Sequence, residues 1–219
     1  MSVPAFQSLL SARAERAGVA ATAETRDRLE EYLGLLARWN RRINLTALPL
    51  DPPTAATIDR LLIEPLVAAT WTRTPQDWYD VGSGSGSPAI PFKIVHSRAK
   101  LTMVESRSRK AAFLREAVRT IGLSDTGVEC ARIEDVAASG LRSRTSDLIT
   151  MRGVKPDVTM WSALQSLLSQ SGMLFWFHSR GAVSDPVGFS RIAIRNLGTS
   201  DDAVLTVYKP ALFHVEHER

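Results

Sequence analysis

The chain has 219 residues, of which 44% are hydrophobic and 23% charged, with no run of 18 or more apolar residues. This length supports one sizeable core, and the missing apolar run argues against a membrane span. The formal net charge is +4, from 27 basic and 23 acidic residues. A surplus made mainly of arginine suits contact with phosphates and bases, but a basic enzyme with solvated arginines fits the charge equally well.

The first residues lack the basic segment and apolar stretch of a secretory signal, so we expect a cytoplasmic protein. Cys130 is the single cysteine and cannot form an internal disulfide, which agrees with a reducing compartment. It follows Val128 in a short apolar run. We therefore expect Cys130 to be buried, like a small hydrophobic residue.

The first seventy or so residues show helical periodicity. After Thr22, whose hydroxyl suits a helix N-cap, apolar residues recur at three- and four-residue steps: Leu29, Leu33, Leu36, Trp39 and Ile43. A loop with three prolines follows, and then a second helical pattern runs through Ile58, Leu61, Leu62 and Leu66. We expect residues 1–72 to form a helical extension packed on a core of residues 73–219.

Beyond residue 77, short apolar runs alternate with helical segments, which is typical of a parallel sheet. The expected strands are Trp78–Val81, Leu101–Glu105, Val128–Cys130, Leu148–Met151 and Met173–Phe177. The expected helices are a short one from Ile90, one over Ala111–Ile121 ended by Gly122, and one over Val158–Leu168 with Asp157 as N-cap.

Two late alternating runs, Arg191–Arg195 and Val204–Tyr208, are separated by a short polar segment containing Gly198 and predict a hairpin. The fold class that we predict is α/β. It is a mostly parallel, doubly wound sheet with a C-terminal antiparallel hairpin and an N-terminal helical extension.

The segment after the first expected strand contains three glycines at G-x-G-x-G spacing, Gly82, Gly84 and Gly86. Such a loop lets a ligand approach bare backbone, but similar loops serve nucleotides, flavins and dinucleotides, and some only make a turn. An acidic residue, Asp80, precedes the first glycine by two positions, and the spacing differs from the dinucleotide pattern G-x-G-x-x-G. Both features favour S-adenosylmethionine, whose ammonium group Asp80 and loop carbonyls would bind.

Glu105 follows the loop by about twenty residues at the end of the second expected strand, where a carboxylate can accept hydrogen bonds from both ribose hydroxyls. After the third strand, Ile133 would pack on the adenine face with Glu134 near its edge; an ordinary turn into a short helix is the alternative. Arg152 ends the fourth strand and would point into the same cleft.

Six basic residues flank the expected cleft and are candidates for RNA binding, with surface solvation as the alternative for each alone: Arg38, Arg41, Arg42, Arg107, Arg109 and Lys110. His214 and His217 are three residues apart, but two imidazoles without further ligands seldom hold a metal, and we expect no metal site. The sequence shows no evident set of Ser, His and Asp residues that would supply a catalytic base. Arg152 is the one candidate for a catalytic contact.

With these motifs, the chain resembles the bacterial 16S ribosomal RNA guanine-N7 methyltransferases of the RsmG or GidB family, as a divergent member. The resemblance covers most of the chain, and its most specific part is the segment from Trp39 to Thr46, with sequence WNRRINLT. Other parts are the residues 80–91, Glu105 with the basic run to Lys110, and the segments 132–134 and 151–153.

The resemblance implies a class I methyltransferase fold and methyl transfer from S-adenosylmethionine to a guanine N7 in the 530-loop region of 16S ribosomal RNA, free or in the 30S subunit. From the sequence itself we expect no membrane association and no obligate protein partner. By resemblance, the cofactor contacts fall on Gly82, Ser87, Ile133, Glu134 and Arg152, with Glu105 as the ribose carboxylate. Guanine N7 carries a lone pair and no proton, so direct in-line displacement needs no general base.

Several positions depart from the family pattern, and these departures concern the RNA side more than the cofactor side. They are Ser87 after the third loop glycine, Ala89, Leu61 in place of a helical histidine, Glu64 and Pro65 in place of an Asp-Ser pair, His178 in place of a lysine, and Ala203 in place of an arginine. Two rival functions follow. One is a methyltransferase with another acceptor, and the other is a non-catalytic ribosome-binding relative.

Overall fold

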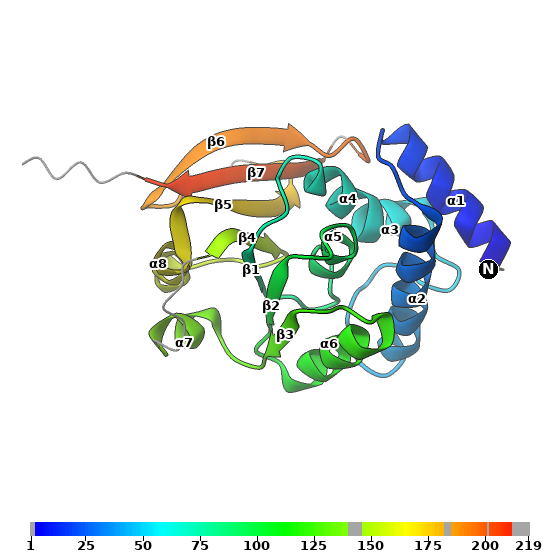
Figure 1. Ribbon diagram of the computed structural model, residues 1–219, viewed down its shortest axis with the longest axis horizontal. Coiled ribbons are helices and arrows are strands. Elements are labelled where there is room, and N and C mark those ends of the chain that lie inside the picture. The colour runs from blue at the N-terminus through cyan, green and yellow to red at the C-terminus, as the bar shows by residue number, and fades with distance from the viewer. Residues whose placement is uncertain (1–2, 140–145, 182–184, 201, 212–219) are drawn as a thin grey trace, which may run out of the picture.

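The computed structural model describes residues 3–139, 146–181, 185–200 and 202–211. Figure 1 shows a central sheet with helices on both sides. The strands are β1 (Asp77–Val81), β2 (Lys100–Val104), β3 (Thr126–Glu129), β4 (Ser146–Arg152), β5 (Leu168–Ser179), β6 (Phe189–Asn196) and β7 (Ala203–Pro210). The helices are α1 (Val3–Arg16), α2 (Ala23–Asn40), α3 (Ala55–Ile58), η1 (Asp59–Ile63), α4 (Glu64–Ala69), α5 (Ala89–Val95), α6 (Ser108–Ile121), α7 (Ile133–Ala138) and α8 (Val158–Leu167).

The sheet has the order β3-β2-β1-β4-β5-β7-β6. The first five of these strands are parallel, and β7 runs antiparallel to both β5 and β6. This confirms the doubly wound sheet and its C-terminal hairpin. The chain builds outward in one direction from β1 to β3 and in the other from β4, so the carboxyl end of β1 lies where open α/β sheets bind ligands.

The N-terminal helices agree with the periodicity, with two differences in detail. Thr22 caps α2 by accepting a hydrogen bond from the Thr25 backbone N–H. The helix ends at Asn40, three residues before Ile43, because the Asn40 side chain accepts hydrogen bonds from the backbone N–H groups of the following loop. The second expected helix is a continuous run over 55–69 that contains a turn of π-helix, η1.

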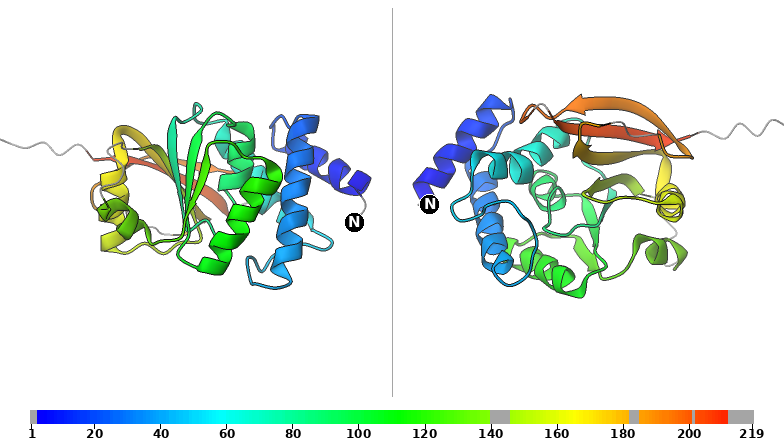
Figure 2. Two further views of the ribbon diagram at one scale, coloured as in Figure 1. Left: turned by 60° about the horizontal axis from the view of Figure 1, so that its bottom comes forward. Right: turned by 180° about the vertical axis from the view of Figure 1, so that it is seen from behind.

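Two hydrophobic clusters pack on opposite faces of the sheet. Side chains alternate along each strand, so Trp78 and Leu148 belong to one cluster, and Tyr79 and Ile149 belong to the other. The first cluster is continuous with α1 and α2, and the second lies under α7 and α8. Figure 2 shows the N-terminal helices beside α5 and α6, with α7 and α8 at the far side. The extension and the sheet therefore share one hydrophobic core.

The expectation for Cys130 was wrong. β3 ends at Glu129, and Cys130 is exposed because it lies in the segment that leaves the edge strand. β5 is longer than expected, since the residues before Met173 extend the strand back to Leu168. Within the part of the chain that the structure describes, no helix combines the length and the apolar character that crossing a membrane requires.

Candidate functional site

The three loop glycines have a conformation that other residues rarely adopt. Their φ angles are +68° at Gly82, +50° at Gly84 and +88° at Gly86. A Cβ atom at Gly82 would lie 2.6 Å from Cγ2 of Val154, and one at Gly86 would lie 2.5 Å from Cδ1 of Ile90. The loop therefore needs glycine both for its backbone angles and for the close approach of its neighbours.

Tyr32 of α2 holds this loop from the side of the extension. Its side chain is fully buried, and its hydroxyl donates a hydrogen bond to the Ser85 carbonyl at 2.8 Å. Burial raises the pKa of Tyr32, so the hydroxyl keeps its proton. The N-terminal extension thus fixes the position of a loop that belongs to the sheet.

Asp80 is buried at the end of β1, on the face covered by the extension. Its Oδ1 accepts a hydrogen bond from the Thr150 hydroxyl at 2.5 Å, and the Thr150 hydroxyl oxygen accepts one from Nε1–H of Trp78 at 2.9 Å. Its Oδ2 is buried and has no partner among the described residues. Burial raises the pKa of Asp80 to about 6, against the hydrogen bonds from Ser83 and Thr150 that lower it. A ligand ammonium group would satisfy this free oxygen.

Glu105 follows β2 directly and links the glycine loop to the start of α6. Its Oε2 accepts a hydrogen bond from the Gly84 N–H at 2.9 Å, and its Oε1 accepts one from the Arg107 N–H at 2.8 Å. A carboxylate has about four acceptor positions, so two remain for ligand hydroxyls. Glu105 both shapes the loop and keeps the capacity expected of a ribose-binding residue.

Ile133 and Glu134 begin α7 beyond the end of β3. Ile133 is buried with Val81 and Val104 of the neighbouring strands, which places an apolar side chain beside the strand ends. Oε2 of Glu134 is buried and has no partner among the described residues. A buried polar atom without a partner is uncommon in native proteins. The arrangement fits a nucleobase, which has apolar faces and polar groups along its edge.

The Arg152 side chain, which is 9% exposed, lies at the end of β4 and joins the glycine loop to the extension. It donates to the Ser87 hydroxyl at 3.1 Å and to the Glu64 carboxylate at 2.7 Å, and it also bonds the Arg60 carbonyl. Its guanidinium lies 4.5 Å from the ring centre of Phe177. Burial lowers the pKa of Arg152 to about 10, and Glu64 opposes the shift.

The residue that sequence reasoning missed here is Glu64. It is 2% exposed and contacts Arg152, Arg60 and, at 3.1 Å, the Thr199 hydroxyl of the β6–β7 turn. Burial raises its pKa, and the two arginines lower it. The sequence noted Glu64 only as a departure, because its partners lie 88 and 135 positions further along the chain.

The structure brings the basic candidates together around two neighbouring hollows. Arg42, Arg107, Arg109 and Lys110 line one of about 630 Å³, and Arg38, Arg41 and Arg42 line another of about 340 Å³. We call these six side chains the basic rim. Arg41 is partly neutralised by an exposed ion pair with Asp51 at 2.7 Å. A Cβ at Gly84 would lie 3.9 Å from Nζ of Lys110, so the rim borders the glycine loop.

The WNRRINLT segment forms the turn that carries part of this rim. Trp39 packs edge-on against Phe113 of α6 at 5.9 Å between ring centres. Asn40 accepts hydrogen bonds from the Leu45 and Thr46 N–H groups and donates one to the Thr46 carbonyl. These contacts fix the turn that presents Arg41 and Arg42. Trp39 and Asn40 therefore have a structural role in the described chain.

The other departures occupy ordinary structural positions. Ser87 donates to the Leu61 carbonyl at 2.9 Å, Leu61 itself is buried, and Ala203 is buried at the start of β7. His178 is hydrogen-bonded through Nε2 to the Thr206 hydroxyl at 2.8 Å. Among the described residues, no group of three potential metal ligands occurs. His214 and His217 lie outside the described residues.

Comparison with known proteins agrees with this geometry. Residues 25–185 match the GidB family, described as rRNA small subunit methyltransferase G. The ribosomal RNA small subunit methyltransferase G of Roseiflexus castenholzii is 34% identical over 173 residues, which cover 78% of this chain and 72% of that protein. Two solved structures share the fold at 14% identity. MtNAS in complex with MTA and tNA has a TM-score of 0.60 and covers 97% of this chain and 90% of its own. A SAM-dependent methyltransferase from Aquifex aeolicus has a TM-score of 0.52, covering 69% and 90%.

The sheet order, the glycine loop at the end of β1 and these structural neighbours define a class I methyltransferase fold. Many members of the class share a glycine loop before the first crossover helix. The choice of methyl acceptor must therefore depend on other parts of the chain. The match over residues 25–185 and the identity of the relatives settle the family. The chain belongs to the rRNA small subunit methyltransferase G family.

Proposed function

We propose that this protein transfers a methyl group from S-adenosylmethionine to N7 of a guanine in the 530-loop region of 16S ribosomal RNA, as part of the 30S subunit or its precursor. The observation that carries this proposal is the position of the basic rim. Lys110 belongs to the rim and also lies beside Gly84 of the glycine loop, where Glu105 is bound. An RNA strand held by the rim would thus reach the donor side of the sheet.

The donor would be held by residues at the carboxyl ends of β1 to β3. The free Oδ2 of Asp80 suits its ammonium group, the remaining acceptor positions of Glu105 suit the ribose hydroxyls, and Ile133 with Glu134 suits the adenine. When bound, this cofactor supplies an electrophilic methyl group on a positively charged sulfur. The protein's part is then to position the acceptor and to match the charge of the transition state.

Guanine N7 needs no general base because it carries a lone pair and no proton. Positive charge moves from the donor to the purine during transfer, so an unpaired cation close to the transfer line would oppose the reaction. Arg152 lies next to Ser87 of the loop and pairs with Glu64, which it shares with Arg60. We infer that Glu64 reduces the positive charge that Arg152 would otherwise place beside the donor while Arg152 supports the loop.

RNA binding would rest on the basic rim, with arginines contacting phosphates and setting the orientation of the strand. Such contacts release counterions, so affinity should fall steeply with salt. A small-molecule acceptor would not require this dependence. Ribosomal RNA is made and assembled in the cytoplasm of bacteria, where we place the protein.

The decisive experiment incubates the protein with labelled S-adenosylmethionine and 30S subunits from cells that lack this methylation, and then maps the modified base. We expect one modified guanine, with the label at N7. Label on another base or another atom would contradict the acceptor that we propose. No donor binding by calorimetry at millimolar concentration would leave a non-catalytic ribosome-binding protein as the better explanation.

Variants separate the donor from the RNA side of the proposal. Changing Arg107, Arg109 and Lys110 together to alanine should weaken binding of the subunit. We expect the loss of about two phosphate contacts, each of which contributes roughly 0.7 to the slope of log affinity against log salt concentration for single strands. Donor affinity should stay as in the wild type. Glu31→Ala, an exposed acidic position on α2 outside the rim, is the matched control. An unchanged salt slope in the triple variant would remove the rim from the RNA site.

A further inference from the structure

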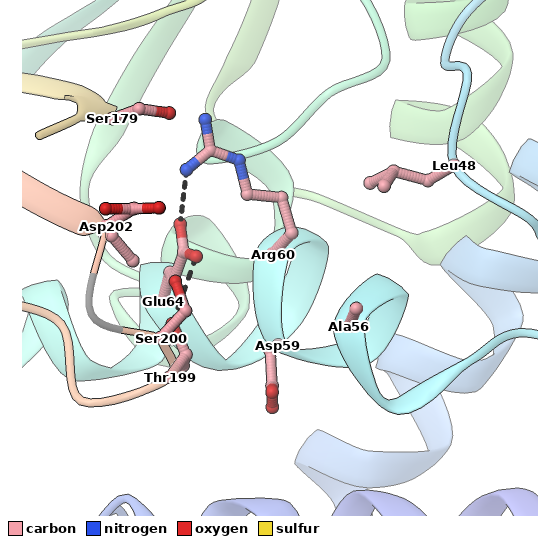
Figure 3. Close-up of a pocket in the computed structure, with 10 residues that line it drawn as sticks. Leu48, Ala56, Asp59, Arg60, Glu64, Ser179, Thr199, Ser200 and Asp202 are labelled. Carbon is pink, nitrogen blue, oxygen red and sulfur yellow. Dashed lines mark hydrogen bonds and ion pairs between the residues drawn. The ribbon is translucent and has the colours of Figure 1, made fainter.

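A cavity of about 320 Å³ lies between the N-terminal extension and the ends of the last strands (Figure 3). Leu48, Arg60 and Glu64 line it from the extension, and Ser179, Thr199 and Asp202 line it from β5 and the β6–β7 turn. Ser179 is the carboxyl end of β5, and Arg152 is the carboxyl end of β4. The cavity therefore opens at the same edge of the sheet as the glycine loop.

Arg152 connects this cavity to the donor side. Its guanidinium bonds Ser87 of the glycine loop and Glu64 of the cavity wall. Arg152 therefore contacts both the donor loop and a residue of the cavity wall. Direct group transfer requires donor and acceptor to lie close together. A cavity at the same edge of the sheet as the donor loop therefore suits the acceptor.

The three carboxylates that line the cavity differ in what they can still bind. The Asp59 carboxylate is turned toward α1, where it accepts hydrogen bonds from Nε and Nη2 of Arg13. Both oxygens of Glu64 are engaged, by Arg60 and Arg152 on one side and by Thr199 on the other. Asp202 is exposed, and its carboxylate has no hydrogen bond or ion pair with any described residue. In Figure 3 the Asp202 carboxylate lies between Ser179 and Glu64.

We propose that this cavity receives the acceptor base and that Asp202 selects guanine by accepting hydrogen bonds from N1–H and the N2 amino group. This inference rests on the proposed function. Among the common bases, guanine presents two adjacent donors on one edge, and a single carboxylate can accept both. Adenine presents a donor beside an acceptor on that edge and would leave one carboxylate oxygen facing a lone pair.

The same arrangement leaves the reacting atom free. N7 lies on the imidazole edge of guanine, across the ring system from N1 and N2, so a base held by Asp202 keeps its N7 lone pair unbonded. An arginine reading N7 and O6, as in many DNA complexes, would occupy that lone pair. Leu48 and Ala56 supply apolar surface for the base face, and Ser179 supplies a hydroxyl at the rim of the cavity.

The test uses 30S subunits reconstituted with inosine in place of the guanosine that the mapping experiment identifies. Inosine keeps N7 and N1–H and lacks the N2 amino group. The wild-type protein should methylate it at least tenfold less efficiently in kcat/KM, the scale of one lost hydrogen bond to a charged acceptor. In Asp202→Asn the preference for guanosine over inosine should fall to about threefold or less, with donor affinity unchanged. Asp77→Asn is the control, because Asp77 begins β1 at the amino ends of the parallel strands, and this variant should keep the full preference.

Equal use of inosine and guanosine by the wild-type protein would overturn the proposal, and this measurement needs no variant. An Asp202→Asn protein that is folded, as judged by its thermal unfolding, and keeps the wild-type preference would also overturn it. Failure of the proposed function looks different. In that case the wild-type protein would not label subunits that contain guanosine at all.

Discussion

The proposed donor side and the proposed acceptor side of the site are built in different ways. The donor side uses residues close in sequence to the ends of β1 and β2, with Glu105 bonding Gly84 only 21 positions away. The acceptor side is assembled from the extension, β4 and the C-terminal hairpin, which Glu64 joins through Arg152 and Thr199. A short motif can therefore specify the donor site, while the acceptor site depends on the whole fold.

The largest effect that would test this comparison is on stability. Glu64→Ala leaves Arg152 buried without its carboxylate partner, and breaking a buried ion pair in this way costs about 3 to 5 kcal/mol. We expect this loss in the free energy of unfolding measured by urea denaturation. Glu31→Ala, which is exposed, should change it by about 0.5 kcal/mol or less. A loss below about 1 kcal/mol in Glu64→Ala would mean that the hairpin and extension do not depend on this residue.

A smaller effect is expected on the donor side. Glu105→Ala removes the acceptor proposed for the ribose and should weaken S-adenosylmethionine binding by about 1 to 3 kcal/mol, the scale for losing a charged hydrogen-bond acceptor. Isothermal calorimetry measures this change directly. Because Glu105 also bonds the Gly84 and Arg107 N–H groups, thermal unfolding is measured alongside. Unchanged donor affinity would refute its role.

The pH dependence of Asp80 tests the donor side in another way. Burial raises its pKa to about 6, so the stability that its neutral form contributes is present at low pH and is lost as the pH rises through about 6. An ammonium ligand prefers the ionised form. Donor affinity should therefore rise roughly tenfold from pH 5 to pH 7, while the donor's own amino group, with a pKa near 7.7, remains largely protonated. In Asp80→Asn, calorimetry should find no such rise; a rise of equal size there would assign it to another group.

The smallest effect concerns the exposed ion pair between Arg41 and Asp51. Its atoms are accessible to solvent, so Asp51→Ala should lower the free energy of unfolding by less than about 1 kcal/mol. The same change frees Arg41 for phosphate, and we expect slightly tighter subunit binding at low salt. Filter binding at two salt concentrations measures this. Weaker binding would indicate that the loop around Asp51, and not its charge, matters for RNA.

Much of the fold followed from local patterns. The N-cap residues Thr22 and Asp157 and the C-terminal Gly122 were identified from the sequence, because caps satisfy backbone groups within a few residues. Cys130 was misplaced because a short apolar run does not show where an edge strand ends. The cofactor roles of Asp80, Glu105 and Glu134 stay predictions, although the free buried oxygens of Asp80 and Glu134 support them.

The sequence by itself determined the doubly wound sheet, the glycine loop and the family, since periodicity, glycine spacing and a short segment such as WNRRINLT are local. Only the tertiary structure decided what Arg152 contacts, and that Lys110 borders the loop. It also decided that Asp59 and Glu64 are already paired, while the Asp202 carboxylate has no partner among the described residues. The physical reason is that hydrogen bonds and ion pairs across 80 or more residues depend on how the layers pack, which no local pattern records.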